Sequence, residues 1–226
     1  MVEKVKEPSA RRAHADDGPL ARVDVSARGG RPATRAALLA AMERLLEREG
    51  LSACTSTAVA AEAGLSAGTF YTYFEDRDAA LAALFADRLD GIVAGVAQAL
   101  TSDRLLDEGL RAAIDAAVGA TVDGYRRHAA ALRAALAAVQ TNAAIRAVYW
   151  DRHAASIEQV QRFLKRGAAA GMVRTDDHRA VAHTMLLALQ GLNSPVVLAA
   201  TDRRLVGGIR RNVAEVLVTL LAPRHT

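Results

Sequence analysis

One short run of residues has the types and the spacing of a catalytic motif. Residues 64–68, Gly-Leu-Ser-Ala-Gly, read as G-x-S-x-G, which in hydrolases places a nucleophilic serine on a turn between a strand and a helix. Such a serine attacks an acyl carbon with the help of a histidine and an acid. Residues 57–63 have a helical pattern, however, and no alternation of strands and helices supplies a sheet. A hydrolase using Ser66 is therefore the weakest interpretation, and we expect no catalytic residue and no enzyme.

The elements around this run are predicted to be two short helices. Thr55 is a candidate N-cap for the first helix, Gly64 ends it, and Ser66 caps a second helix over about 67–73. Phe70 and Phe74 are four residues apart and share the face that packs on the domain. The residues left to face outward are Ala67, Gly68, Thr69, Tyr71, Thr72 and Tyr73. Small and hydroxyl-bearing side chains on an exposed helix suit the DNA major groove, but an ordinary helical hairpin fits the pair equally well.

A longer pattern favours DNA binding. Between Arg31 and Leu81 the sequence resembles the N-terminal domain of TetR-family transcriptional repressors. The matching residues are Ala63, Gly64, Leu65, Ser66, Gly68, Thr69, Phe70, Tyr71, Tyr73, Phe74 and Leu81, preceded by Ala41, Gly50, Val59 and Ala60. Arg77 stands where that family usually has Lys, and Cys54 and Ser56 replace a common Thr and an apolar residue. The resemblance implies a three-helix helix-turn-helix domain that binds double-stranded operator DNA.

Individual roles on DNA can be assigned from residue type. We expect Thr69 and Tyr73 to bind phosphates, and Ala67, Gly68 and Thr72 to approach base edges. Basic side chains beside the helix pair can neutralise phosphates. The full set of expected DNA-binding residues is Arg31, Arg35, Thr55, Ser66, Ala67, Gly68, Thr69, Tyr71, Thr72, Tyr73 and Arg77.

Total charge does not carry this interpretation. The chain has a net charge of +4, yet residues 1–78 hold 11 basic against 12 acidic residues and residues 79–226 hold 18 against 13. The predicted DNA-binding half is thus slightly acidic. The only support that charge gives to DNA binding is local, because Arg28, Arg31 and Arg35 lie in a run without acidic residues. A solvated basic tail explains Arg28 equally well.

Composition indicates an all-α chain. Ala- and Leu-rich segments with helical spacing dominate the 226 residues, and no alternating β-branched run predicts a strand. We expect a disordered basic arm over 1–30, the helix-turn-helix domain over 31–78, and a larger helical effector-binding and dimerisation domain over 79–226. One cysteine, no long apolar span and no signal peptide favour the cytoplasm and no membrane. No metal-ligand spacing or cofactor motif is present, so we expect no metal and no cofactor.

Further helices are predicted over about 76–100, 104–127, 129–139, 142–170, 177–199 and 203–221, with Gly171 closing the long one and Pro195 kinking or interrupting the next. The last helix has an apolar stripe of Val206, Ile209, Val213, Val216, Leu217 and Leu220. The helix before it is apolar almost all round, so it is buried on more than one side. Completion of the monomer core explains both helices, but the resemblance implies a homodimer formed through residues 177–221.

The resemblance also implies a small-molecule effector pocket within about 90–200. Polar and aromatic residues in this Ala- and Leu-rich region are the candidates to line it. The candidates are Tyr125, Tyr149, Trp150, His153, His183, Gln190 and Asn193. The sequence thus predicts a ligand-responsive, dimeric DNA-binding repressor. An all-α carrier of apolar molecules without DNA binding is the alternative, but it leaves the exposed Thr69, Tyr71 and Tyr73 unexplained.

Overall fold

The computed structural model describes residues 26–174 and 177–223, and these residues form helices without any strand. In chain order they are α1 (Ser26–Glu49), a 3-10 turn η1 (Leu51–Ala53), α2 (Ser56–Glu62), α3 (Ala67–Tyr73), α4 (Arg77–Ala99), α5 (Ser102–Arg127), α6 (Ala129–Ala138), α7 (Ala143–Ala169), α8 (His178–Gly191), α9 (Pro195–Leu198) and α10 (Arg203–Leu221). The predicted all-α class is confirmed. None of the described helices is long and apolar enough to cross a bilayer.

The helix ends follow the predicted local chemistry. The side chain of Thr55 accepts a hydrogen bond from Ala58 N (3.1 Å), and that of Asp76 accepts one from Ala79 N (2.7 Å). Gly64 and Gly171 have φ of 72° and 71°, the left-handed conformation that ends a helix most cheaply at glycine. These caps fix where the short helices begin and end, which keeps α2 and α3 to seven residues each.

One predicted boundary is corrected. The disordered arm predicted over 1–30 is too long, because residues 26–30 belong to α1, which bends at Gly30 (φ 64°) just before Pro32; residues 1–25 lie outside the described residues. The interruption predicted at Pro195 is confirmed, because α8 ends at Gly191 and Pro195 begins α9. Proline lacks the N–H that a continuing helix needs and suits a first turn.

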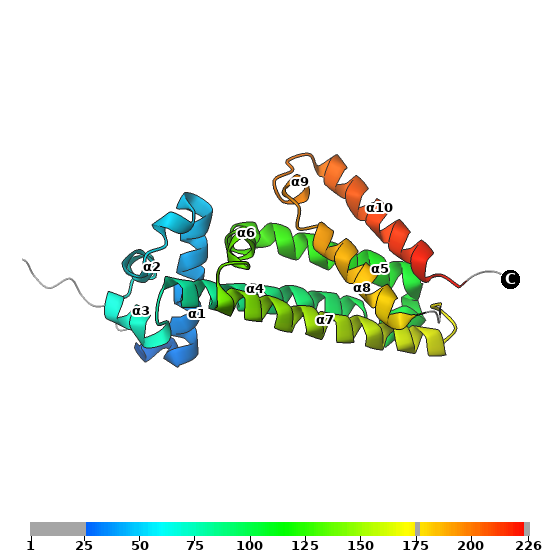
Figure 1. The fold of residues 1–226 in the computed structure, drawn as a ribbon, viewed down its shortest axis with the longest axis horizontal. Helices are drawn as coiled ribbons and strands as arrows, with labels where there is room; N and C mark the ends of the chain where they lie inside the picture. The colour runs from blue at the N-terminus through cyan, green and yellow to red at the C-terminus, as the bar shows by residue number, and fades with distance from the viewer. Residues whose placement is uncertain (1–25, 175–176, 224–226) are drawn as a thin grey trace, which may run out of the picture.

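The helices form a small unit and a larger one that share a continuous core (Figure 1). Helices α1–α3 make the small unit, and the long helices α4, α5 and α7 run side by side through the larger one. Helix α4 belongs to both, since it packs on α1 and also on α5, α6 and α7. Helix α10 packs on α5, whereas α8 packs on α7. Helix α6 also packs on α1, so both α4 and α6 connect the larger unit to the small one.

Candidate functional site

Helix α3 is anchored by one face. Phe70 is fully buried and Phe74 is 5% exposed, with ring centroids 5.5 Å apart. They pack in the core of the small unit beside the buried Leu38 and Met42 of α1. Leu65 of the turn is half-buried against the same core. The predicted packing of the two phenylalanines is confirmed, and it leaves the other faces of α3 to solvent.

The exposed surface of α3 is small and hydroxyl-rich. Gly68, Tyr71 and Thr72 are exposed, with Tyr71 at 59%, while Ala67 and Thr69 are half-buried. Tyr73 departs from the prediction, because its ring is half-buried and packs on the core. Only part of that side chain is left to meet a ligand. Of the six residues predicted to face outward, Gly68, Tyr71 and Thr72 are exposed, and Ala67, Thr69 and Tyr73 are exposed only in part.

Hydroxyl groups at the start of α3 are held in fixed positions. Ser66 Oγ accepts a hydrogen bond from Thr69 N (3.2 Å) and lies 2.9 Å from Thr69 Oγ1. Thr72 Oγ1 donates to the carbonyl oxygen of Gly68 (3.1 Å). Ser66 thus caps a helix that follows another helix, not a strand. The local structure required of a nucleophile elbow does not occur here.

Basic side chains flank this surface. Arg31 and Arg35 of α1 are exposed, and the guanidinium carbon of Arg35 lies 5.7 Å from the ring centroid of Phe74. Arg77, at the start of α4, is half-buried and pairs with Asp78 over 3.2 Å. A partly exposed pair of this kind is weak and exchangeable. The predicted residues Arg35 and Thr69 belong to the same small unit.

A charged cluster joins the small unit to the larger one. Glu43 of α1 contacts Arg88 of α4, with Oε2 2.7 Å from Nη2 and 2.9 Å from Nε. Its other oxygen, Oε1, accepts a hydrogen bond from Nδ1 of His128, just before α6, over 2.7 Å. All three side chains are at most 19% exposed. We call Glu43, Arg88 and His128 the junction; sequence reasoning did not identify it, because its members lie up to 85 positions apart.

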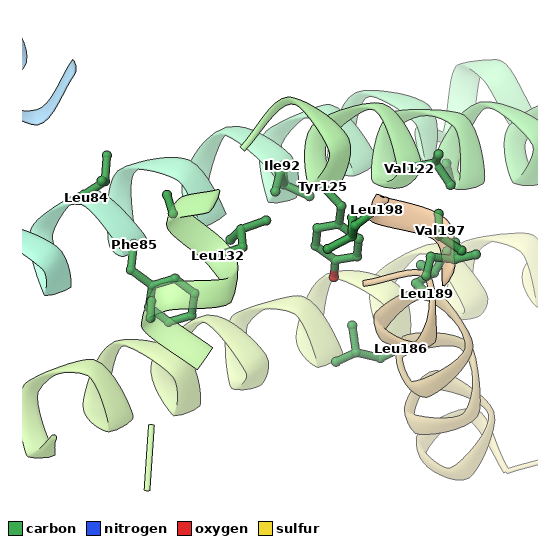
Figure 2. Close-up of a cluster of buried hydrophobic side chains, with 14 of the residues drawn as sticks. Leu84, Phe85, Ile92, Val122, Tyr125, Leu132, Leu186, Leu189, Val197 and Leu198 are labelled. Carbon is green, nitrogen blue, oxygen red and sulfur yellow. The ribbon is translucent and has the colours of Figure 1, made fainter. Parts of the chain in front are cut away.

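A cavity of about 210 Å³ lies in the larger unit between α4, α5, α6, α7 and α8. Five of the seven predicted pocket residues line it: Tyr125, Tyr149, His153, Gln190 and Asn193. Figure 2 shows Phe85 of α4 and Leu132 of α6 in the same apolar cluster, and Tyr125 with its hydroxyl oxygen pointing from α5 toward α7 and α8. The cavity walls are mainly apolar, as in small-molecule sites.

Two predicted pocket residues do not line this cavity. Trp150 is 56% exposed and faces a separate shallow depression beside Leu136 and Arg146. His183 lies one turn beyond the cavity, with its ring centroid 6.0 Å from that of His153. The rings of Trp150 and Tyr149 lie 5.1 Å apart between centroids and both line the depression, but only Tyr149 also lines the cavity.

Sequence reasoning also missed several polar lining residues. Arg152, Ser156 and Gln159 of α7 line the cavity, as does Thr121 of α5. The spacing of the α7 residues from Tyr149 is helical, at three, seven and ten positions, and this signal was available in the sequence. Arg152 holds Asp90 of α4 through two contacts of 2.8 and 2.9 Å, which neutralise its charge.

Burial controls the protonation state of two side chains that line the cavity, Tyr125 and His153. Desolvation first, and the neighbouring Tyr149 second, raise the pKa of Tyr125 to about 12. Burial first, and His183 second, lower the pKa of His153 below its ordinary 6.5. Both groups are therefore uncharged at neutral pH. Outside the cavity, burial raises the pKa of the Cys54 thiol, which opposes a reactive thiolate. Within the described residues no cluster of three or more His, Cys, Asp or Glu could hold a metal ion.

Comparisons with known proteins identify a family match for the small unit and solved structures with the same fold. Residues 38–84 match the family model described as bacterial regulatory proteins, tetR family. No curated protein matches the chain. Three solved structures share its fold. A Pseudomonas aeruginosa PAO1 protein assigned as a transcriptional regulator is 21% identical, with a TM-score of 0.69 over 88% of this chain and 96% of its own.

The second solved structure is a TetR transcription regulator of Haloarcula marismortui, with 17% identity and a TM-score of 0.71 over 84% of this chain and 99% of its own. The third is SmeT, solved as a complex with triclosan, with 16% identity and a TM-score of 0.66 over 84% and 92%. At these identities the structures establish the common fold across both units, and the family match covers the unit that carries α3.

Proposed function

This chain belongs to the TetR family of bacterial regulatory proteins, and from that premise we propose that it is a repressor released from a pseudo-palindromic operator by a small-molecule effector. Members of the family are DNA-binding transcriptional regulators. The observation that carries the proposal is helix α3, which is anchored mainly by Phe70 and Phe74 and exposes Gly68, Tyr71 and Thr72. Such a surface on the second helix of a helix-turn-helix suits the major groove.

The proposed DNA contacts combine this helix with its basic surroundings. The exposed hydroxyl-bearing residues of α3 and Thr55 at the start of α2 bind phosphates or base edges, and Gly68 permits close approach. Arg31 and Arg35 neutralise phosphates, while Arg77 exchanges Asp78 for DNA. Ser66 acts indirectly, because its hydroxyl is committed to capping α3. The positive charge beside α3 comes from these three arginines, because the small unit as a whole has no excess of basic residues.

Effector binding is proposed to act through the junction. Phe85 and Leu89, which line the cavity, lie on either side of Arg88 in α4, and the lining residue Leu132 lies one turn after His128. A ligand that widens the cavity pushes on both helices that hold Glu43. The small unit then rotates, and the two copies of α3 in a dimer no longer match one operator. The ligand thus shifts the population toward a state that does not bind DNA.

A homodimer is part of the proposal. Apolar side chains remain exposed on the last helices, namely Leu187 of α8, Val196 of α9, and Leu205 and Val216 of α10. We propose that these side chains meet a second copy of the chain, because exposed apolar surface that gathers in one patch marks protein contacts. A two-fold pair presents two α3 helices to two half-sites. SmeT, a relative in fold, was solved with the small molecule triclosan, which agrees with a ligand site in this architecture.

The first experiment identifies the operator and then tests α3. Purified full-length protein selects genomic fragments, and fluorescence anisotropy measures binding to the recovered site and to a random duplex. Tyr73→Phe keeps the half-buried ring but removes its hydroxyl, so we expect weaker binding to both duplexes. Loss on the operator alone contradicts a phosphate contact by Tyr73. Failure to select any fragment contradicts the function itself.

A charge-matched pair tests the basic flank. We expect Arg35→Ala to weaken operator binding and to reduce the slope of log K against log salt by about 0.9, the value for one phosphate. Arg133→Ala removes the same charge from an exposed position on α6 and leaves that slope unchanged. Equal slopes for both variants contradict the proposed contact of Arg35.

A further inference from the structure

We infer that the cavity takes an uncharged, mainly apolar molecule of about one substituted ring, which carries a single hydrogen-bonding group met by Tyr125. This inference rests on the proposed function, since it takes the cavity to be the effector site. It adds the chemical class of the ligand, which the size, charge and free polar atoms of the cavity determine.

Size excludes large ligands. The cavity measures about 210 Å³, and a cavity of roughly 150 Å³ is known to hold benzene. One ring with a short substituent therefore fills the space. Ten of the lining residues are apolar, namely Phe85, Leu89, Ile92, Val93, Val96, Leu132, Leu136, Val160, Leu186 and Leu189. They make most of the contact with such a ligand.

Charge excludes ionised ligands. At neutral pH Arg152 is the ionised group among the described residues that line the cavity, and Asp90 already neutralises it through two contacts. His153 is held neutral by burial, and its Nδ1 lies 3.2 Å from Nε2 of Gln190. A charged ligand would lose its hydration without gaining an unpaired counter-ion. The cavity therefore favours a neutral molecule.

Most polar side chains of the cavity are already bonded. Thr121 Oγ1 donates to the carbonyl oxygen of Ala117 (2.8 Å), and Ser156 Oγ donates to that of Arg152 (2.7 Å). Tyr125 is 9% exposed and lines the cavity, and the described residues offer its hydroxyl no hydrogen bond. Asn193 Oδ1 is the lining atom that is fully buried without a partner among the described residues. Buried polar atoms without partners indicate a missing bonding group.

Tyr149 and Gln159 also line the cavity without a hydrogen bond among the described residues, but both are half-buried. The candidates to meet the polar group of the ligand are therefore the hydroxyl of the buried Tyr125 and the buried Oδ1 of Asn193. A hydroxyl such as that of Tyr125 can donate or accept, while an amide oxygen such as Asn193 Oδ1 only accepts. A ligand hydroxyl satisfies either of them. Tyr125 is the better candidate, since its oxygen points away from α5 into the space between α7 and α8 (Figure 2).

Four matched probes test this assignment by calorimetry on the full-length protein without DNA at pH 7. The probes are 4-propylphenol, propylbenzene, 4-propylbenzoate and 4-propylbenzylamine, which share one ring and one chain. We expect 4-propylphenol to bind about three- to tenfold more tightly than propylbenzene, the contribution of one neutral hydrogen bond. Both ions should bind more weakly than propylbenzene. Tightest binding of 4-propylbenzoate overturns the inference, because the anion would then take Arg152 from Asp90.

A variant pair locates the hydrogen bond. Tyr125→Phe keeps the ring and should abolish the advantage of 4-propylphenol while leaving propylbenzene binding unchanged. Ser52→Ala removes a hydroxyl from an exposed position of η1 and should alter neither. An advantage that survives Tyr125→Phe overturns the assignment. Because binding is measured without DNA, a chain that selects genomic fragments but binds no probe contradicts this inference alone, and one that binds the phenol but no DNA contradicts the proposed function.

Discussion

Glu43 and His128 are 85 positions apart in the sequence, yet Oε1 of Glu43 accepts a hydrogen bond from Nδ1 of His128 over 2.7 Å. The same carboxylate also holds Arg88 of α4. One acidic side chain of the small unit thus contacts two helices that line the cavity of the larger unit. This arrangement gives the proposed effector a physical route to α1, which packs on α2, and α2 packs on α3.

Replacement of Glu43 should weaken that route. Glu43→Gln keeps the size of the side chain but removes the charge that pairs with Arg88, so we expect the free energy of unfolding to fall by about 1–3 kcal/mol. We also expect a smaller ratio of operator affinities measured without and with 4-propylphenol, since that ratio is the coupling between the sites. Thermal unfolding and fluorescence anisotropy measure the two effects.

Glu47→Gln is the matched control. Glu47 lies one turn further along α1 and is exposed, so its replacement changes the same charge without touching α4 or α6. If Glu43→Gln lowers stability but leaves the ratio of operator affinities as it is in the unaltered protein, the junction stabilises the fold and does not transmit the ligand signal.

Substitutions at Gly64 and Gly68 should affect stability and DNA binding differently. Gly64 has φ of 72°, and a Cβ added there would meet no other atom within 4 Å, so Gly64→Ala should cost about 1–2 kcal/mol through backbone strain alone. Gly68 lies in regular helix, where alanine is favoured by up to about 1 kcal/mol. Gly68→Ala should therefore keep or raise the melting temperature but weaken operator binding by its added methyl group. Unchanged operator affinity in Gly68→Ala would place that residue away from the groove.

Local signals in the sequence predicted the helix-turn-helix well. Thr55, Ser66 and Asp76 cap α2, α3 and α4 as expected, because N-capping depends on residues only three positions apart. The same holds for the spacing of Phe70 and Phe74. Tyr73 was the exception, since its half-burial depends on how closely α3 lies on the rest of the small unit.

The cavity was predicted only in part, for a related reason. Residue type alone selected both Tyr149 and Trp150, but only Tyr149 lines the cavity, because adjacent residues of a helix point in directions about 100° apart. Counting by helical spacing from Tyr149 would have added Arg152 and Ser156 and excluded Trp150. The junction was beyond local reasoning, because the pairing of Glu43 with Arg88 and His128 requires knowing which helices are neighbours.

An acid-sensitive contact stabilises the small unit. Glu62 of α2 binds Arg48 (2.9 Å) and Arg44 (2.8 Å) of α1. The hydrogen bond from Arg48 first, and that from Arg44 second, lower the pKa of Glu62 from 4.5 to about 2. A lowered folded-state pKa means that this stabilisation is complete above the unfolded value near 4.5 and is lost as pH falls toward 2.

Glu62→Gln tests this pH dependence. We expect the variant to melt below the unaltered protein at pH 7, with a difference that shrinks between pH 4.5 and 2. Glu75→Gln, at an exposed position after α3, provides the control and should show no comparable trend. A difference that stays constant from pH 7 to 2 would mean that the carboxylate charge of Glu62 contributes nothing to stability.

The proposed dimer face consists of the apolar side chains that α8 and α10 expose to solvent. Helix α10 buries Ala214, Leu217 and Leu221 against its own chain, while Val216 is 64% exposed. Leu187 of α8 is 65% exposed. If these outward side chains meet a second copy, Leu187→Glu or Val216→Glu should bury a charge in the contact and raise the dimer dissociation constant at least tenfold, because an unpaired buried charge is costly. Sedimentation velocity measures the change.

Leu106→Glu is the control: it alters a comparably exposed leucine on α5 and should leave the dimer intact. Monomeric variants should lose operator affinity as well, since one α3 helix then reads a single half-site. A dimer that survives both α8 and α10 substitutions must use another face.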